Sequence, residues 1–134
     1  MPPISYKIQI HGTFEDVINQ VTQALQGEGF GILTRIDLHS KVKEKLGKDL
    51  RPVAILGACN PQLAYDAYSQ NPDVASLLPC NAVVREIASG TISVEIAKPT
   101  VLLQILNDSK LNAMAEDADR RLQRVASEMQ SKAA

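Results

Sequence analysis

Two cysteine–asparagine dipeptides, Cys59-Asn60 and Cys80-Asn81, are the residues whose types and placement could do chemistry. Thiols serve as ligands for soft metal ions and as redox centres. Cys59-Asn60-Pro61 follows an apolar run and precedes a helical pattern, so a thiol there lies near unpaired backbone N–H groups and the positive end of a helix dipole. Cys80-Asn81 opens a later strand. A site near both thiols is therefore one interpretation of this sequence.

Whether the two thiols meet depends on how the strands around them are connected. If the strands before and after the intervening helix are antiparallel neighbours, the end of one lies beside the start of the other, and Cys59 and Cys80 share one edge of the sheet. If the connection is a right-handed parallel crossover, the two thiols lie at opposite ends of the sheet. The residues alone leave both arrangements open.

The functional interpretation is a ligand site formed by Cys59, Asn60, Cys80 and Asn81, in which the thiols bind a soft metal or cycle to a disulfide. Two thiols do not complete a tetrahedral zinc site, and no Cys-x-x-Cys spacing is present, although a dimer could supply four thiolates. The structural interpretation makes both cysteines small buried residues. Asn60 is then a helix cap and Asn81 a turn former. The identity of any metal or cofactor is unknown at this level.

Other polar features are more typical of surface positions. His11 and His39 have no Asp, Glu or Cys at metal-ligand spacing, so we expect surface residues. The basic stretch 41–51 is expected to be a solvated face, because aromatic residues make up only 4% of the chain and tryptophan is absent. The glycines of 27–31 follow a helix and precede a strand, the reverse of a dinucleotide-binding fingerprint.

Hydrophobic periodicity predicts the elements that would position these residues. Strands are expected at 4–10, 30–36, 53–58, 81–87 and 91–96. Helices are expected at 14–25, 38–46, 61–70 and 101–106, followed by a long helix that is capped at Asp108 or Ser109 and ends near Met129. Thr13 and Asn60 are the expected caps of the first and third helices. The order of these elements predicts an α+β fold.

Composition limits the class of protein. With 134 residues, a net charge of −1 and two cysteines, the chain is expected to be a single domain, 1–134, with free thiols in a reducing cytoplasm. We expect no nucleic-acid or membrane partner, because the charge is nearly balanced and no apolar run approaches the length of a membrane span.

Apolar residues on several strands raise the question of what covers the second face of the sheet. Ala54, Leu56, Val84 and Val94 are not expected all to point to the same helical layer as their neighbours, which favours dimerisation through the sheet or its edge. Short helices that cover the second face are the alternative.

The motifs Gly57-Ala58-Cys59-Asn60-Pro61 and Leu77 to Glu86, with the segments 12–16 and 29–33, resemble the bacterial and archaeal domain-of-unknown-function family three-zero-two over nearly the whole chain. The resemblance implies a β-α-β(4)-α fold, with an antiparallel meander sheet packed on helices, similar to a single copy of the TATA-binding-protein repeat. It also implies a homodimer. In that arrangement the meander brings Cys59 and Cys80 to the same edge. No activity follows from the family, because function resides in sites and not in folds.

Three functions are compatible with these observations. The favoured one is a small homodimeric cytoplasmic binding module with a ligand or metal near Cys59 and Cys80, which is preferred to an enzyme without excluding one. The second is a thiol-dependent redox enzyme or sensor. The third is a structural or interaction protein without site chemistry.

Overall fold

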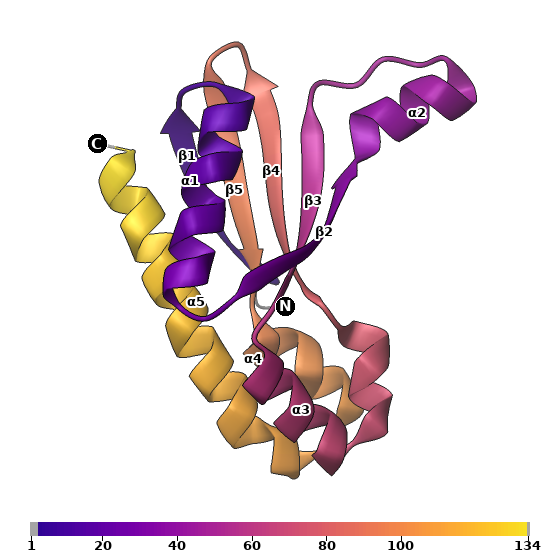
Figure 1. Cartoon of the computed structure of the whole chain (residues 1–134), viewed down its shortest axis with the longest axis vertical. Coiled ribbons are helices and arrows are strands. Elements are labelled where there is room, and N and C mark those ends of the chain that lie inside the picture. The colour runs from indigo at the N-terminus through magenta and orange to yellow at the C-terminus, as the bar shows by residue number, and fades with distance from the viewer. Residues whose placement is uncertain (1–2, 134) are drawn as a thin grey trace.

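The computed structural model describes residues 3–133 and shows an α+β fold built on one sheet (Figure 1). The strands are β1 (Ser5–His11), β2 (Gly31–Asp37), β3 (Val53–Cys59), β4 (Cys80–Ala88) and β5 (Thr91–Ala97). The helices are α1 (Phe14–Gly27), α2 (Leu38–Leu46), α3 (Pro61–Gln70), α4 (Pro99–Leu102) and α5 (Asn112–Lys132), with short 3-10 turns η1 (Pro72–Leu77), η2 (Leu103–Leu106) and η3 (Ser109–Leu111). All five predicted strands are present, and so are the predicted helices at 14–25, 38–46 and 61–70. The predicted helix at 101–106 is divided between α4 and η2, and the long last helix begins at Asn112, so Asp108 caps η3 and not α5.

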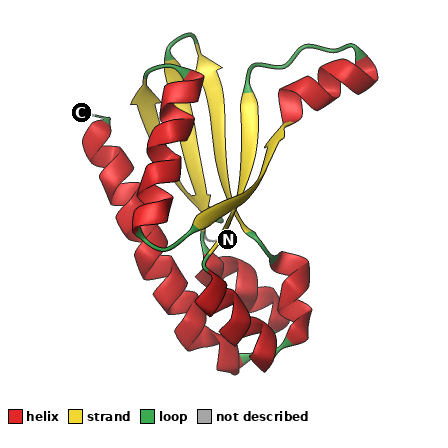
Figure 2. Ribbon diagram, viewed as in Figure 1, coloured by secondary structure: helices red, strands yellow, loops and turns green. Residues whose placement is uncertain are grey.

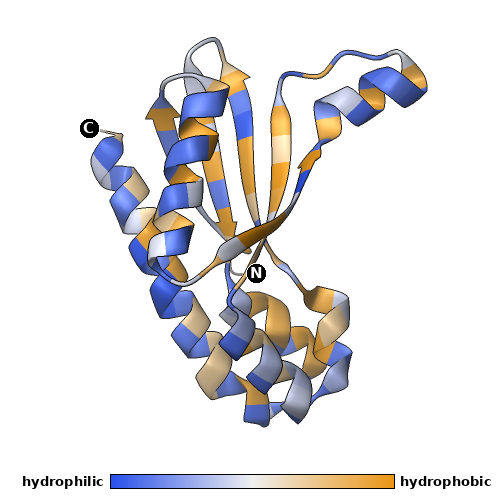
Figure 3. Cartoon of the chain, in the orientation of Figure 1, coloured by the Kyte–Doolittle hydropathy of each residue, from blue (hydrophilic) through white to orange (hydrophobic). Residues whose placement is uncertain are grey.

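The sheet is antiparallel throughout, in the order β1-β5-β4-β3-β2. Strands β2 to β5 form a meander, and β1 closes the far edge by pairing with β5 from Ser5 opposite Ala97 to His11 opposite Thr91. Hydrophobic and hydrophilic residues alternate along the strands (Figure 3), so one face of the sheet is apolar. The antiparallel meander expected from the family resemblance is therefore confirmed.

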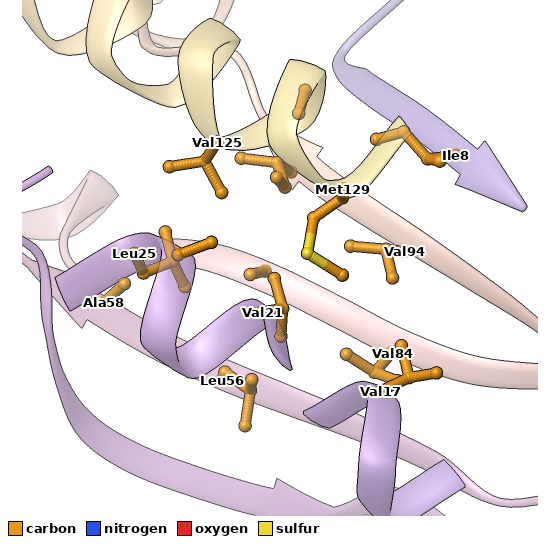
Figure 4. Packing of buried hydrophobic residues seen from close by; sticks show 14 of the residues in the cluster. Ile8, Val17, Val21, Leu25, Leu56, Ala58, Val84, Val94, Val125 and Met129 are labelled. Atoms are coloured by element: carbon orange, nitrogen blue, oxygen red, sulfur yellow. The ribbon is translucent and has the colours of Figure 1, made fainter. Parts of the chain in front are cut away.

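Helices α1 and α5 cover the apolar face (Figure 2). In Figure 4, Val17, Val21 and Leu25 of α1 point toward the sheet, and Met129 of α5 lies between α1 and β1. Each of these four side chains is at most 1% exposed. The oxygen of the Thr13 side chain accepts a hydrogen bond from the backbone N–H of Asp16 (3.2 Å), so the predicted cap of α1 is confirmed.

Residues that are neighbours along a strand lie on opposite faces of the sheet. Ala54, Leu56, Val84 and Val94 are all at most 1% exposed in the same core, against the same helical layer. Their sequence neighbours, such as Val53, Ile55 and Val83, lie on the other face. The prediction that the four residues would not share a layer with their neighbours is therefore confirmed. The other face carries the exposed side chains of Lys7, Gln9, His11, Asn81 and Arg85 and the half-buried side chains of Val53, Ile55 and Val83.

A smaller cluster lies beyond the end of the sheet where β3 ends and β4 begins. Ala67 of α3, Val74 of η1 and Leu111 of η3 are buried there, with Leu103, Leu106 and Met114 packed around them. In Figure 1 these short helices gather below the sheet, beside the N-terminal half of α5. We call this group of α3, η1, α4, η2 and η3 the helical cap. No helix within residues 3–133 is long and apolar enough to cross a membrane.

Candidate functional site

A mostly apolar cavity of about 50 Å³ lies between the end of the sheet and the helical cap. Its walls come from β3, β4, α3, η1, α4, η2 and α5, so segments far apart in the sequence converge on it. Cys59, Asn60 and Cys80 all line the cavity, together with Met114 of α5. The structure thus brings three of the four predicted site residues to one place.

The antiparallel pairing of β3 with β4 explains why both thiols reach the cavity. Ala58 lies opposite Cys80 in the register, and Cys59 is the next residue of β3. Of the two arrangements that the sequence left open, the shared edge is the one present. Both cysteines are free thiols and each is partly buried, so the two residues are not joined by a disulfide.

Gly57 and Pro79 fix the approach of the two strands at this edge. A Cβ atom on Gly57 would contact the Thr34 hydroxyl and would lie 2.8 Å from Cγ of Pro79. The Leu78–Pro79 peptide bond is cis. Since a methyl group has no room between these neighbours, glycine allows the proline ring to pack directly on β3, one residue before Cys80.

Asn60 has the predicted capping role. Its side-chain oxygen accepts a hydrogen bond from the backbone N–H of Leu63 (3.1 Å), and the residue is only 9% exposed. Pro61 follows as the first residue of α3. Gly29, with a φ of +86°, lets the Asn60 amide pack against the turn after α1, because a Cβ there would lie 2.8 Å from Asn60 Nδ2.

The structure does not bring Asn81 to the cavity. Asn81 is exposed and lies opposite Gly57 in the register, while its neighbours Cys80 and Ala82 point to the helical side. The alternation of side chains along a strand therefore separates the two residues of the second dipeptide.

Burial dominates the electrostatics of the thiol pair. Desolvation first, and then the nearby Cys59 and Asp119 side chains, raise the pKa of the Cys80 thiol to about 11. Cys80 is therefore protonated at neutral pH and is a poor nucleophile as a free thiol.

A buried carboxylate close to this region was not predicted. Asp119 of α5 is 8% exposed and accepts hydrogen bonds from the Tyr6 hydroxyl and the Thr100 hydroxyl, and from the Thr100 backbone N–H (3.1 Å). It thereby ties β1 and the start of α4 to α5. Desolvation and then the hydrogen bond to Asp119 raise the pKa of Tyr6 to about 12. The signal in the sequence is helical spacing, since Asp119 stands on the same stripe as Ala115, Ala118 and Leu122.

The remaining polar candidates have structural contacts. His11 is exposed as expected, but His39 is half-buried, and its Nδ1 accepts a hydrogen bond from the Val53 backbone N–H (3.0 Å), which fastens α2 to β3. Lys43 and Arg51 of the basic stretch pair with Asp49 and Glu86, each at 3.0 Å. Within residues 3–133 there is no group of three or more His, Cys, Asp or Glu side chains that could hold a metal ion.

Comparisons with known proteins agree on one family. A family model described as "Domain of unknown function DUF302" matches residues 6–129. A crystal structure of an uncharacterized conserved DUF302 protein from Bacillus stearothermophilus is similar to this chain, with 30% sequence identity and a TM-score of 0.84. That match covers 99% of this chain and 100% of the other. No curated protein matches.

Proposed function

Because the chain belongs to the DUF302 family, a family of domains of unknown function, we propose its function from its own site: it is a homodimeric binding module that holds a small ligand in the cavity beside Cys59 and Cys80. The observation that carries this proposal is the convergence of both cysteines and the capping Asn60 on one mostly apolar cavity. Ligand sites in proteins are typically concave and apolar, with a small number of polar or reactive groups that fix the ligand.

The volume of the cavity limits what it holds as it stands. At about 50 Å³ it is well below the roughly 150 Å³ of an engineered apolar cavity that takes up benzene. The occupant is therefore a single ion or a very small molecule, or else a larger molecule that enters as the helical cap moves. Movement of the cap is physically reasonable, because its buried cluster is small and separate from the main core.

The arm formed by β2 and α2 supports the dimer. No residue of α2 is buried, and in Figure 1 the helix extends away from the sheet. Within residues 3–133, five of the nine exposed large hydrophobic residues lie on or beside this arm, namely Leu33, Ile36, Leu38, Leu46 and Leu50. Exposed apolar clusters of this kind mark interaction surfaces, and a second copy that covers the arm accounts for them.

Two other functions have less support. A thiol-dependent enzyme needs a reactive thiolate, and the raised pKa of Cys80 works against one. A protein with no site chemistry leaves the convergence of both thiols on one cavity unexplained.

The strand order also supports the resemblance to a single TATA-binding-protein repeat, although a fold likeness carries no DNA binding with it. Two free thiols suit a reducing cytoplasm.

A cavity-filling variant tests the proposal. Ala115 is 5% exposed and lines the cavity. The variant Ala115→Val therefore fills part of the cavity while both cysteines are kept. Native mass spectrometry of protein purified without chelator or reductant is expected to show a dimer with a bound mass for the wild type and a dimer without it for Ala115→Val. The matched control is Ala113→Val, at an exposed position of α5. An identical bound content in all three proteins, or none in any, contradicts the proposed site.

A further inference from the structure

Three sulfur-containing side chains from three separate elements line the same cavity. Cys59 ends β3, Cys80 begins β4, and Met114 lies in the first turn of α5. The chain contains only two cysteines and three methionines, so most of its sulfur atoms border a space of about 50 Å³. A purely packing role requires apolar side chains at these positions, but it does not require sulfur in all three.

We infer that Cys59, Cys80 and Met114 form a binding site for a soft monovalent metal ion, Cu(I). This inference rests on the proposed binding function of the cavity and names the chemical class of its ligand. Thiolate and thioether sulfur atoms are the donors that Cu(I) selects among protein side chains. A single ion also fits a cavity too small for most organic molecules.

The donor set at the cavity distinguishes Cu(I) from commoner ions. Ca²⁺ and Mg²⁺ require several oxygen ligands, whereas the one amide oxygen at the cavity, that of Asn60, already accepts the hydrogen bond from Leu63. A structural Zn²⁺ site requires four nitrogen, sulfur or oxygen ligands, and thioethers are not among its usual donors. Residues 3–133 contain no group of three His, Cys, Asp or Glu side chains placed to supply them.

The proton and charge balance of binding is simple. Two S–H bonds break, two protons pass to solvent and two sulfur–copper bonds form, while Met114 donates a lone pair and releases no proton. Copper enters and remains as Cu(I), so no oxidant or reductant takes part. The two thiolates and the cation leave one net negative charge. Cys59 directly precedes Asn60, the cap of the ten-residue helix α3, so the positive end of that helix dipole lies where it offsets this charge.

An anaerobic competition titration tests the site. The full chain is titrated with Cu(I) against a chromogenic Cu(I) chelator, as wild type, Cys59→Ser, Cys80→Ser and Met114→Leu. We expect one Cu(I) per wild-type chain. Affinity should fall by at least ~100-fold in either serine variant and by about tenfold in Met114→Leu, since loss of a direct ligand costs at least as much as loss of a group that supports one.

Met129→Leu is the matched control. Met129 is buried in the main core, away from the cavity, and exchange of methionine for leucine conserves volume. Its Cu(I) affinity should equal that of the wild type. X-ray absorption of the copper-loaded protein should show a first shell of sulfur only. If a serine variant fails to fold, the comparison of the Cu(I) affinities of Met114→Leu and Met129→Leu still tests the copper site.

Failure of this inference differs from failure of the proposed function. Wild-type protein that loses all Cu(I) to the chelator, or that binds it as tightly after Cys80→Ser or Met114→Leu, overturns the copper site. If the wild type then still carries a bound mass that Ala115→Val removes, the cavity remains a binding site for another ligand. If Ala115→Val changes neither copper affinity nor bound mass, the cavity itself is not the site and both proposals fail.

Discussion

At the scale of single residues, Asp119 stands out because its charged side chain is only 8% exposed. A buried carboxylate is tolerated only when hydrogen bonds replace its hydration. Asp119 obtains three such bonds from Tyr6 and Thr100, residues of two other segments. The carboxylate therefore holds α5 to the first strand and to the segment that follows the last strand.

Replacing this carboxylate with an amide should have two measurable effects. In Asp119→Asn an N–H₂ group faces donors that need an acceptor, so the free energy of unfolding should fall by about 1–3 kcal/mol, as measured by urea denaturation. The pKa of Tyr6 should also fall from about 12 toward 10.0, because the hydrogen bond and negative charge that favour the protonated phenol are lost while desolvation remains. Absorbance titration of tyrosine, with Tyr6→Phe to assign the signal, measures this change.

The control is Asp117→Asn, two residues earlier on the same helix. Asp117 is partly exposed and pairs with Arg121 of α5 at 3.2 Å, so both quantities should stay close to those of the wild type. An unchanged tyrosine titration in Asp119→Asn would show that the carboxylate does not govern the Tyr6 hydroxyl.

At the scale of elements, the approach of β3 and β4 positions the thiols. Gly57 of β3 has no side chain, and the ring of Pro79 occupies the space beside it. The next residue, Cys80, then enters the register opposite Ala58. The site thus depends on a close contact between two strands as well as on its lining residues.

A methyl group at Gly57 tests this dependence. Gly57→Ala places a Cβ 2.8 Å from Cγ of Pro79, a rigid ring, so a strand must shift. We expect a loss of about 1–3 kcal/mol in the free energy of unfolding, as for other overpacked sites. Gly31→Ala is the matched control on the neighbouring strand, because a Cβ there meets no atom within 4 Å. Equal urea midpoints for the two variants would contradict the tight contact.

The sequence predicts elements better than their mutual arrangement. Alternating and helical spacing locate every strand and the caps at Thr13 and Asn60, because these signals are local. Whether Cys59 meets Cys80 depends on strand direction, which local spacing does not encode. Spacing predicts the last helix but not the role of Asp119, because the partners of Asp119, Tyr6 and Thr100, lie 113 and 19 residues away in the chain.

At the scale of the whole molecule, the chain divides into a packed body and a projecting arm. The body encloses the main core between the sheet and two helices. The arm ends in α2, which has no buried residue and is fastened to β3 through His39 and Val53. An isolated chain therefore leaves a hydrophobic surface uncovered, which is the basis for the proposed dimer.

Charges on the arm should separate the dimer. In the double variant Leu38→Glu with Leu46→Glu, two carboxylates replace side chains that are 39% and 66% exposed in the single chain, so the fold should tolerate them while a dimer interface should not. Size-exclusion chromatography with light scattering should give a dimer mass for the wild type and a monomer mass for the variant.

The control places the same charges on a different exposed surface. Tyr65→Glu with Tyr68→Glu alters α3 side chains that are 69% and 53% exposed, and this variant should remain a dimer. If only the tyrosine variant dissociates, the dimer interface lies on α3 and not on the arm. If the wild type is a monomer, the proposed dimer does not exist.

The pairing of β1 with β5 has a consequence for synthesis of the chain. Within the sheet β1 pairs with β5 alone, so β1 is synthesised well before its partner, which begins at Thr91. At ~5–20 residues per second, translation leaves β1 without that partner for roughly 4–17 s. During this interval Ile8 and Ile10, at most 5% exposed in the finished fold, lack the strand beside which they are buried. β1 can therefore pair within the sheet only after β5 has been synthesised.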